Sequence, residues 1–444
     1  MARTAKKEKA LTPEEKLAQA LAPDVEQPYR VPDNWCWVVQ GQVSAFHNGR
    51  AYKQAELLED ETKTPVLRVG NLFTNTSWYY SDLKLDENKY LDSEDLIYAW
   101  SASFGPFIWH GGRVIYHYHI WKVELTSVLK KEFYYYWLVN DTERLKKQGH
   151  GTGMIHVTKE MMENTAIPLP PLAEQQRIVD RIESLFTKLD EAKEKAQAVV
   201  DGFGDRKVAI LHKAFTGELT AEWRNTHGVS IADWENAPLE TVFQLRSGST
   251  IDVCEELEYG AIPYVKVADM NLPENEIQIT TSSRFVDECP ESHVIPKGST
   301  IFPKRGGAIL TNKKRYVGVE KIIADLNTMA IMPIAGRAYG WYGYYWMQSV
   351  DLRQLNNGSN VPQINNKDMV KLFVPTPSID EQKAIVGILD GVFDKEIEAK
   401  ETAEQVIDQI DSMKKSILAR AFRGELGTND PNDESAVELL KRVL

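Results

Sequence analysis

A basic stretch in an acidic chain holds the side chains with the clearest chemical potential. The full sequence has 64 Asp and Glu against 52 Lys and Arg, a formal net charge of −12, yet residues 297–321 contain Glu320 as their single acid. The cations of this stretch are Lys297, Lys304, Arg305, Lys313, Lys314, Arg315 and Lys321. Gly306 and Gly307 follow Arg305, and a glycine backbone can approach a phosphate closely. Such a local excess of positive charge is typical of a nucleic-acid interface, with a solvated pair of basic strands as the alternative.

Other polar residues could read bases rather than phosphates. In the major groove Arg and Lys pair with guanine, and Asn and Gln pair with adenine. The overall acidity argues against a binder that relies on net charge alone, so we expect local contacts from both halves of the chain. The candidates for DNA contact are Arg68, Asn71, Ser101, Ser103, Arg113 and His150 in the first half and Lys266, Lys304, Arg305, Lys313, Lys314, Arg315, Asn357, Asn360 and Gln363 in the second.

The sequence lacks the patterns of the common catalytic sites. It has no GxxxxGK phosphate loop, no HExxH zinc motif and no Asn-Pro-Pro-aromatic methylase tetrad. The glycine-rich residues 149–153 lack dinucleotide spacing and follow an expected helix, which favours a flexible loop. Pro32-Asp33 and Glu191-Ala192-Lys193 have the letters of a nuclease site, but the second group lies on an expected long helix as solvated charge. His117 and His119 alternate along an expected strand, where ordinary strand residues are favoured over metal ligands. We therefore expect a non-catalytic chain without a metal or cofactor of its own.

A long internal repeat organises the elements that must position these residues. Residues 168–219 align without a gap with residues 375–426 at a constant offset of 207, and 23 of the 52 pairs are identical. Each copy opens with prolines, which cannot sit inside a helix, and continues with apolar residues at alternating steps of three and four. That spacing is a heptad seam, interrupted by Arg206 in the first copy and by Glu396 in the second.

One apolar seam needs a partner. The simplest arrangement packs the two copies against each other, and two ordinary amphipathic helices on separate globules are the alternative. Gly202 and Gly204 occur in the first copy only, and they predict a kink or break in its helix.

The segments between the repeats have a different pattern of residues. Short apolar and aromatic runs separated by Gly, Asn and Ser predict strands and loops, with one clear helix in each segment, over Phe133–Leu145 and Trp341–Leu355. Residues 262–267 echo residues 64–69. The sequence therefore predicts an α+β chain in which two mixed α/β domains are separated by two long helices. The expected boundaries are 1–34 for an N-terminal extension, 35–167 for the first domain, 168–233 for the first helical spacer, 234–374 for the second domain and 375–444 for the second spacer with a C-terminal helix.

Three further features concern the N-terminal segment, membrane signals and the cysteines. The charged N-terminal segment could form a short helix through Leu17 and Leu21, either docked on the protein or disordered until a partner binds. The sequence shows no run of eighteen apolar residues and no signal peptide, so we expect no membrane span. The few cysteines fit a reducing cytoplasm, because they are not in CxxC or metal-binding spacing; they are Cys36, Cys254 and Cys289.

The ends of the repeat resemble those of specificity subunits of type I restriction-modification systems. The resemblance lies in PLPPLAEQQRI at 168–178 and AFTGELTAEWR at 214–224, with second copies PTPSIDEQ at 375–382 and AFRGEL at 421–426. It covers nearly all of the chain. It implies that each domain is a target recognition domain for one half of a bipartite, asymmetric DNA sequence. It also implies that the helices pack as an antiparallel coiled coil with pseudo-two-fold symmetry, which fixes the unread gap between the half-sites.

The same resemblance implies partners and cofactors. We expect double-stranded DNA, two methyltransferase (M) subunits that dock on the helices, and restriction (R) subunits. S-adenosylmethionine would be bound by the M subunits, which modify an adenine in each half-site, and ATP and Mg would be used by the partner subunits rather than by this chain. In this family an N-terminal segment such as residues 1–34 can complete a circular arrangement with the C-terminus. A coiled-coil adaptor without DNA specificity is the alternative, and the basic stretch and the two diverged domains argue against it.

Overall fold

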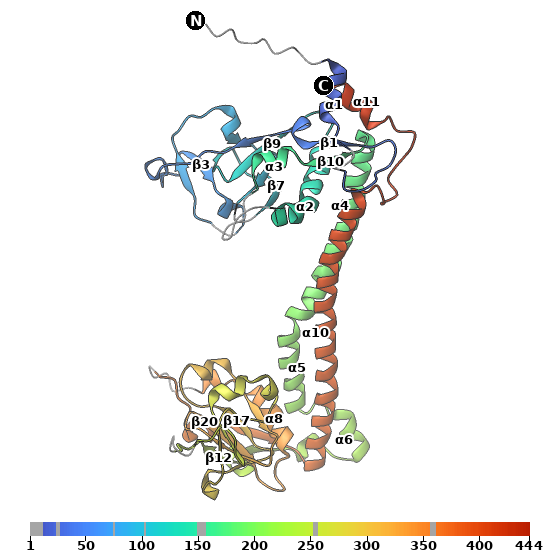
Figure 1. Cartoon of the computed structure of the whole chain (residues 1–444). Helices are drawn as coiled ribbons and strands as arrows, with labels where there is room; N and C mark the ends of the chain where they lie inside the picture. Colours follow the sequence, from blue (N-terminus) through green and yellow to red (C-terminus); the bar gives the residue numbers. More distant parts are fainter. Residues whose placement is uncertain are drawn as a thin grey trace. The chain divides into compact units, whose positions relative to one another are not determined.

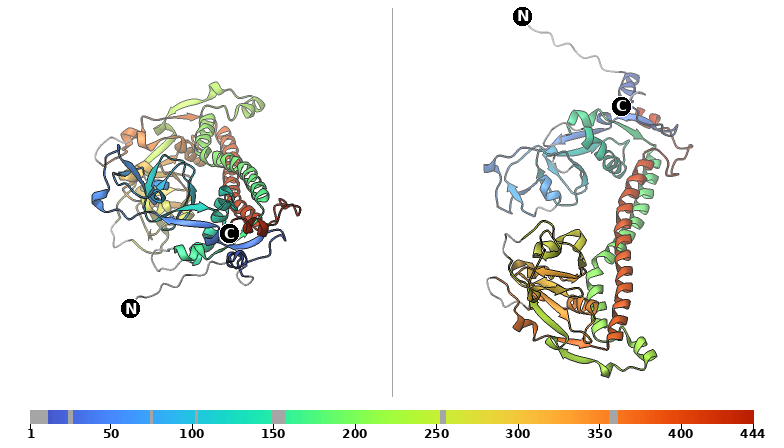
Figure 2. Two further views of the ribbon diagram at one scale, coloured as in Figure 1. Left: turned by 90° about the horizontal axis from the view of Figure 1, so that it is seen from above. Right: turned by 60° about the horizontal axis from the view of Figure 1, so that its bottom comes forward.

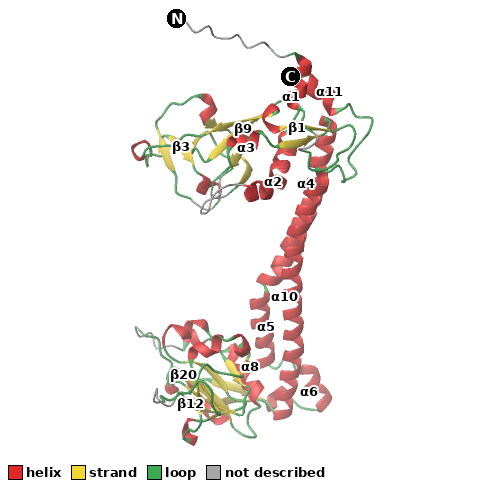
Figure 3. Ribbon diagram, in the orientation of Figure 1, coloured by secondary structure: helices red, strands yellow, loops and turns green. Residues whose placement is uncertain are grey.

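The chain folds into two compact units. The computed structural model describes residues 12–23, 27–73, 76–101, 104–148, 157–251, 256–355 and 361–444. Unit 1 consists of residues 1–195 and 406–444, and unit 2 consists of residues 196–405. Each unit combines one sheet-containing domain with a segment of both long helices (Figure 1, Figure 3).

The domain of unit 1 is built on two four-stranded sheets and a two-stranded ribbon. The sheets have the strand orders β2-β9-β6-β7 and β4-β3-β8-β5, and the ribbon pairs β1 with β10. Strands β3 and β8 run parallel. The strands are β1 (Cys36–Val39), β2 (Ser44–Asn48), β3 (Thr64–Leu67), β4 (Tyr79–Ser81), β5 (Tyr90–Leu91), β6 (Leu96–Ala99), β7 (Gly105–Ile108), β8 (Val114–Tyr116), β9 (Ile120–Leu125) and β10 (Ala166–Leu169).

The domain of unit 2 repeats this plan with one additional strand, β14, at the edge of its first sheet. Its sheets have the orders β12-β20-β17-β18-β14 and β15-β13-β19-β16, and its ribbon pairs β11 with β21. Strands β13 and β19 run parallel, as β3 and β8 do. The strands are β11 (Glu235–Pro238), β12 (Phe243–Ser247), β13 (Ile262–Val265), β14 (Gln278–Ile279), β15 (Phe285–Val286), β16 (Ile295–Pro296), β17 (Thr300–Pro303), β18 (Arg315–Val317), β19 (Lys321–Ala324) and β20 (Thr328–Pro333), with β21 (Phe373–Thr376).

Helices cover the sheets and link them to the repeated segments. Unit 1 contains α1 (Pro13–Ala20), α2 (Lys131–Gln148), α3 (Lys159–Glu163) and α11 (Ala436–Lys441), and unit 2 contains α5 (Phe203–Phe215), α6 (Ala221–His227), α7 (Leu239–Val242), α8 (Gly340–Ser349) and α9 (Asn366–Met369). The other two helices, α4 (Leu172–Asp201) and α10 (Ile379–Ala421), contribute to both units. Within the described residues, no helix is both long and apolar enough to span a membrane.

The predicted break in the first repeat is confirmed. Helix α4 ends at Asp201 and α5 begins at Phe203, with Gly202 between them, whereas α10 is a single helix of 43 residues (Figure 2). Contacts between the repeats run in opposite directions along the chain. In unit 1, Lys193 pairs with Asp411 at 2.7 Å, and in unit 2, Arg206 pairs with Glu396 at 2.7 Å.

The PLPPLAEQ motif fixes the domain of unit 1 to the start of α4. The indole Nε1 of Trp35 donates to Oε2 of buried Glu174 at 2.7 Å. The Gln175 side chain donates to the Val128 carbonyl and accepts from the Lys130 amide, both at 2.8 Å. These bonds satisfy backbone groups just before α2. They therefore link the start of α4 to the domain of unit 1.

The second copy makes the same contacts in unit 2. Trp234 donates to Oε2 of Glu381 at 2.9 Å. Gln382 donates to the Arg337 carbonyl at 2.9 Å and accepts from the Tyr339 amide at 2.8 Å, just before α8. In each unit the motif therefore anchors the start of a long helix to the domain.

The N-terminal segment is docked rather than free over its described residues. Ala20 is fully buried, Leu21 bridges to Val38 of β1, and α1 packs on α11. Lys16 Nζ donates to the Leu444 carbonyl oxygen at 2.6 Å. Helix α1 and the C-terminal residues therefore meet within unit 1.

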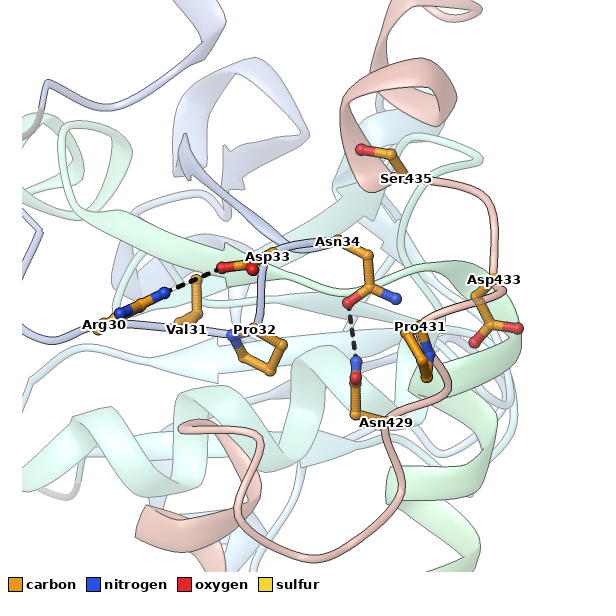
Figure 4. Close-up of a pocket in the computed structure, with 9 residues that line it drawn as sticks. All are labelled: Arg30, Val31, Pro32, Asp33, Asn34, Asn429, Pro431, Asp433 and Ser435. Atoms are coloured by element: carbon orange, nitrogen blue, oxygen red, sulfur yellow. Dashed lines mark hydrogen bonds and ion pairs between the residues drawn. The ribbon is translucent and has the colours of Figure 1, made fainter.

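A hollow lies between residues 30–34 and residues 429–435, the loop that follows α10 (Figure 4). The Asn429 side-chain amide donates to Oδ1 of Asn34 at 2.8 Å across it. Asp433 on its rim accepts from Arg177 of α4 at 2.5 Å. The loop after α10 is thus tied to both the N-terminal segment and the first repeat.

Candidate nucleic-acid interface

In unit 1 the ends of three strands meet at one edge of the domain. The amide of His117, just after β8, donates to the Leu67 carbonyl at the end of β3 at 2.9 Å. The amide of Trp100, just after β6, donates to the His119 carbonyl at 3.1 Å. We call this surface edge 1; it consists of Arg68, Trp100, Ser101 and His117–His119.

Unit 2 has the same edge with the same backbone bonds. The Asp325 amide donates to the Val265 carbonyl at 3.0 Å, and the Lys304 amide donates to the Asn327 carbonyl at 2.8 Å. We call this surface edge 2; it consists of Lys266, Lys304, Arg305, Asp325–Asn327 and Gln363. The hydrogen bonds equate Arg68 with Lys266, Trp100 with Lys304, His117 with Asp325 and His119 with Asn327.

A glycine fits against the turn at each edge. Gly49 precedes the bond from Arg50 to the Tyr116 carbonyl, and Gly248 precedes the bond from Ser249 to the Ala324 carbonyl. A Cβ on Gly49 would lie 2.3 Å from the His117 carbonyl oxygen, and one on Gly248 would lie 1.8 Å from the Asp325 carbonyl oxygen. Only glycine permits this close approach of two backbones.

Edge 1 combines a cation with aromatic rings. Arg68 donates to the Ser77 carbonyl at 2.8 Å and lies over the Tyr79 ring at 4.5 Å. Burial, with smaller contributions from His119 and Arg68, lowers the pKa of His117 to about 4. The imidazole is therefore neutral near pH 7 and has one donor and one acceptor nitrogen.

Edge 2 is more polar. Arg305 and Gln363 lie opposite each other in a β-bridge, with the Ile364 amide bonded to the Lys304 carbonyl at 2.8 Å. Burial, followed by the Arg305 charge, lowers the pKa of Lys304. Burial raises the pKa of Asp325, which accepts from Asn327 at 2.8 Å.

Several predicted residues thus come together at the two edges. Arg68 lies at edge 1, and Lys266, Lys304, Arg305 and Gln363 lie at edge 2. Ser101 follows Trp100 at edge 1 but is buried, with 1% of its surface exposed, so its predicted DNA contact is corrected in the same way as that of Lys314 below. The side-chain oxygen of Asn71 accepts from the Arg68 amide at 3.1 Å, so Asn71 stabilises the backbone of edge 1. Ser103, His150, Asn357 and Asn360 lie outside the described residues.

The basic stretch 297–321 does not form a single surface. Lys314 is only 1% exposed, and it donates to the Val350 carbonyl at 2.6 Å and to Oδ1 of Asn312 at 2.8 Å. Its burial lowers the pKa of the ammonium group to about 7. The inclusion of Lys314 among the DNA contacts is therefore corrected: its role here is structural.

Three other predicted cations have protein partners away from the edges. Arg113 precedes β8, at the end opposite His117, and pairs with Glu87 at 2.6 Å and Asp92 at 2.7 Å. Lys313 donates to the side chain of Asn271. Arg315 is half-buried and donates to the Lys314 carbonyl at 3.0 Å.

The sequence interpretation missed several residues of the edges. β8 ends at Tyr116 and β9 begins at Ile120, so His117, Tyr118 and His119 form the connecting turn and not a continuous strand. Trp100, Asp325 and Asn327 were not recognised at all. The signal that finds them is the repeat of backbone bonds, which appears only in three dimensions. No group of three or more His, Cys, Asp or Glu among the described residues could hold a metal ion.

Known proteins are similar to this chain in sequence over most of its length. Over 440 residues the chain is 24% identical to the EcoBI specificity subunit of a type I restriction enzyme from Escherichia coli, covering 93% of this chain and 92% of that protein. It is 25% identical over 429 residues to the MjaVIII specificity subunit from Methanocaldococcus jannaschii, covering 91% and 95%.

Solved structures agree in fold. The HsdS subunit from Thermoanaerobacter tengcongensis matches 90% of this chain and 100% of its own length, with a TM-score of 0.62 at 19% identity. A chain from a structural study of complex assembly in the type I R-M system matches with a TM-score of 0.66 at 19% identity, over 90% and 100%. The predicted combination of two mixed domains and long helices is thereby confirmed.

A family model matches both segments of the chain that contain the edges. The model, described as the type I restriction modification DNA specificity domain, matches residues 32–200 and residues 231–409. Each match includes one edge, the ribbon that anchors it and the start of the following long helix. With two copies of that domain over most of its length, the chain belongs to the type I restriction-modification DNA specificity family.

Proposed function

We propose that this DNA specificity subunit reads a bipartite, asymmetric target, with one half-site for each domain. The supporting observation is that edges 1 and 2 share a backbone but not side chains: Arg68, Trp100 and His117 at one correspond to Lys266, Lys304 and Asp325 at the other. A common frame with different donors and acceptors suits two different sets of base pairs. A coiled-coil adaptor would have no use for such paired edges, and the family excludes that alternative.

The long helices act as the spacer between the domains. Opposite-running ion pairs and matched cation–π contacts support an antiparallel coiled coil with pseudo-two-fold symmetry. Lys414 lies over the Phe186 ring at 4.9 Å in unit 1, and its repeat equivalent Lys207 lies over Phe393, the equivalent of Phe186, at 5.9 Å in unit 2. A stiff helix pair of fixed length would set the number of base pairs between the half-sites.

The helices also offer docking surfaces for methyltransferase subunits. Large apolar side chains are exposed on them; they are Val208, Ile397, Val406 and Met413. Two of these lie in each unit, which suits two M subunits. In this proposal the M subunits carry S-adenosylmethionine, R subunits with ATP and Mg perform restriction, and this cytoplasmic chain supplies recognition of double-stranded DNA without catalysis.

Methylation mapping tests the recognition function. The chain is co-expressed with its methyltransferase partner in a host without adenine methylation, and methylated adenines are located genome-wide. We expect one motif made of two specific halves with a fixed gap. A single contiguous motif, or methylation without sequence preference, would refute the proposal.

A paired insertion tests the spacer. Seven residues added after Lys193 in α4 and seven after Ile410 in α10 keep the seam in phase and keep the Lys193–Asp411 pair on one side of both insertions. Each insertion lengthens its helix by about 10 Å at about 1.5 Å per residue, or about three base pairs at about 3.4 Å. The gap should grow with both half-sites unchanged, whereas the insertion in α4 alone should abolish methylation. An unchanged gap in the double insertion would contradict the spacer role.

A further inference from the structure

The turn between β8 and β9 is held rigidly. Tyr118 donates its amide to the Arg50 carbonyl at 3.1 Å, and Ile120 donates to the His117 carbonyl at 3.0 Å. With the bonds to Leu67 and Trp100, the turn is tied to three other segments of the domain, and Gly49 packs against its backbone. A backbone fixed in this way presents its side chains in a defined geometry.

The side chains of the turn form a connected group of rings. Ring centroids are separated by 4.4 Å for His117 and Tyr118, by 3.9 Å for Tyr118 and His119, and by 5.0 Å for His119 and Trp100. Trp100 also donates its indole N–H to the Tyr118 carbonyl at 2.8 Å. Tyr118 is 38% exposed, and its hydroxyl has no hydrogen-bond partner among the described residues. The group therefore places a hydroxyl and an imidazole at the surface on a preorganised base.

The backbone does not require these side chains. In unit 2 the equivalent turn keeps the bonds to the end of β13 and to the residue after β17, yet it carries Asp325, Leu326 and Asn327. A turn needed only for folding would favour small or turn-forming residues such as Gly, Asn and Asp. The turn of unit 2 fits that preference, whereas three consecutive rings in unit 1 do not. Their presence at the surface indicates a ligand.

The surroundings indicate which ligand. Arg68 lies at the end of β3, next to His117, and supplies positive charge beside the rings. Hydroxyl and imidazole groups can donate and accept hydrogen bonds, and apolar ring edges can contact the thymine methyl group in the major groove. This combination suits base pairs with a flanking phosphate rather than a phosphate alone.

We infer that His117 and Tyr118 determine which bases are accepted in the half-site of the first domain. This inference rests on the proposed function and deepens it, because it assigns base recognition in that domain to the turn between β8 and β9. Arg68 and Arg305 then serve mainly to hold the DNA backbone.

The test uses methylation mapping with the intact chain and its methyltransferase partner. His117→Ala and Tyr118→Ala should relax base preference in one half-site, with at least a tenfold rise in methylation at sites with a changed base there. The other half-site and the gap should be unchanged. His110→Ala is the matched control, because His110 is an exposed histidine of the same domain on the other side of β8, paired with Glu94 at 2.8 Å.

Each outcome decides the inference. Tyr118→Phe keeps the rings and removes the hydroxyl, so it replaces Tyr118→Ala if the latter does not fold, as judged by circular dichroism and melting temperature. If folded variants at His117 and Tyr118 leave both half-sites unchanged, the inference is overturned. If they alter both half-sites, the assignment of this turn to a single half-site is wrong. If the wild-type chain gives no bipartite motif, the failure lies with the proposed function instead.

Discussion

Arg206 donates its Nε–H to Oε2 of Glu396 at 2.7 Å, so the two polar residues that interrupt the two heptad seams are partners. Arg206 also donates to the Val199 carbonyl at 2.8 Å, across the break at Gly202. In the repeat alignment their equivalents are Met413 and Leu189, which are apolar. The two copies therefore have charged residues at one set of equivalent positions in the helix pair and apolar residues at the other.

This exchange predicts a rescue. Arg206→Met or Glu396→Leu alone leaves a partly buried charge unpaired and should lower the free energy of unfolding by about 1 kcal/mol. The double variant Arg206→Met/Glu396→Leu installs the apolar residues of the other copy and should return close to wild-type stability. A double-mutant cycle by urea denaturation measures the coupling. Additive losses in the double variant would show that the two residues act independently.

The two anchoring glutamates should differ in their sensitivity to substitution. Glu381 accepts from the buried Arg224 guanidinium at 2.8 Å and from Trp234, whereas Glu174 accepts from Trp35 and Asn429. Glu381→Gln leaves Arg224 buried without a counter-charge and should cost about 3–5 kcal/mol. Glu174→Gln should cost clearly less. Equal losses in melting temperature would contradict this asymmetry.

Glu174 should also make stability depend on pH. Burial raises the pKa of its carboxyl above the usual value, against the opposing hydrogen bonds from Trp35 and Asn429. A raised folded-state pKa means that protonation favours folding, so this stabilisation is complete below the ordinary glutamate pKa and is lost as pH rises through the raised value. The melting temperature of the wild type relative to Glu174→Gln should therefore fall as pH increases from about 4. A constant difference across this range would disprove the effect.

Lys314 predicts the opposite trend at higher pH. Its folded-state pKa is about 7, below the ordinary lysine value, so the unfolded chain binds more protons between these two values. Stability should therefore rise with pH across that window. Lys314→Met removes the titrating group, and the stability of the wild type relative to this variant should increase from pH 7 to pH 10. Thermal unfolding in matched buffers measures the difference, and a flat profile would show that Lys314 stays charged in the folded state.

Arg305 provides a test of edge 2. Arg305→Ala should weaken binding to DNA that carries the second domain's half-site, and loss of a phosphate contact should reduce the salt slope of log K by about 1. Lys297→Ala is the control, because Lys297 is paired with Glu320 at 3.4 Å. Fluorescence anisotropy at several salt concentrations gives both quantities. Unchanged affinity would remove Arg305 from the interface.

Local patterns predicted the scaffold well. The heptad spacing and the glycines of the first copy are short-range signals, and α4, α5 and α10 follow from them. The edges were harder to predict, because Tyr118 and His119 lack the Gly, Asn or Pro that usually marks a turn. The alternation of apolar and polar residues therefore predicts a strand that continues through His117–His119. Lys314 shows another limit: its acceptor on Val350 is 36 residues away, and sequence alone does not show which lysine of a basic run is buried.

The glycines at the two edges have a practical consequence for retargeting. Because Gly49 and Gly248 leave no room for a side chain against the turn backbones, each edge divides into a backbone frame common to both domains and side chains that differ between them. A library that randomises 117–119 or 325–327 while keeping these glycines would sample new base preferences on an unchanged frame. A side chain at either glycine would clash with the turn backbone and displace the whole turn. A retargeting library should therefore leave these two glycines unchanged.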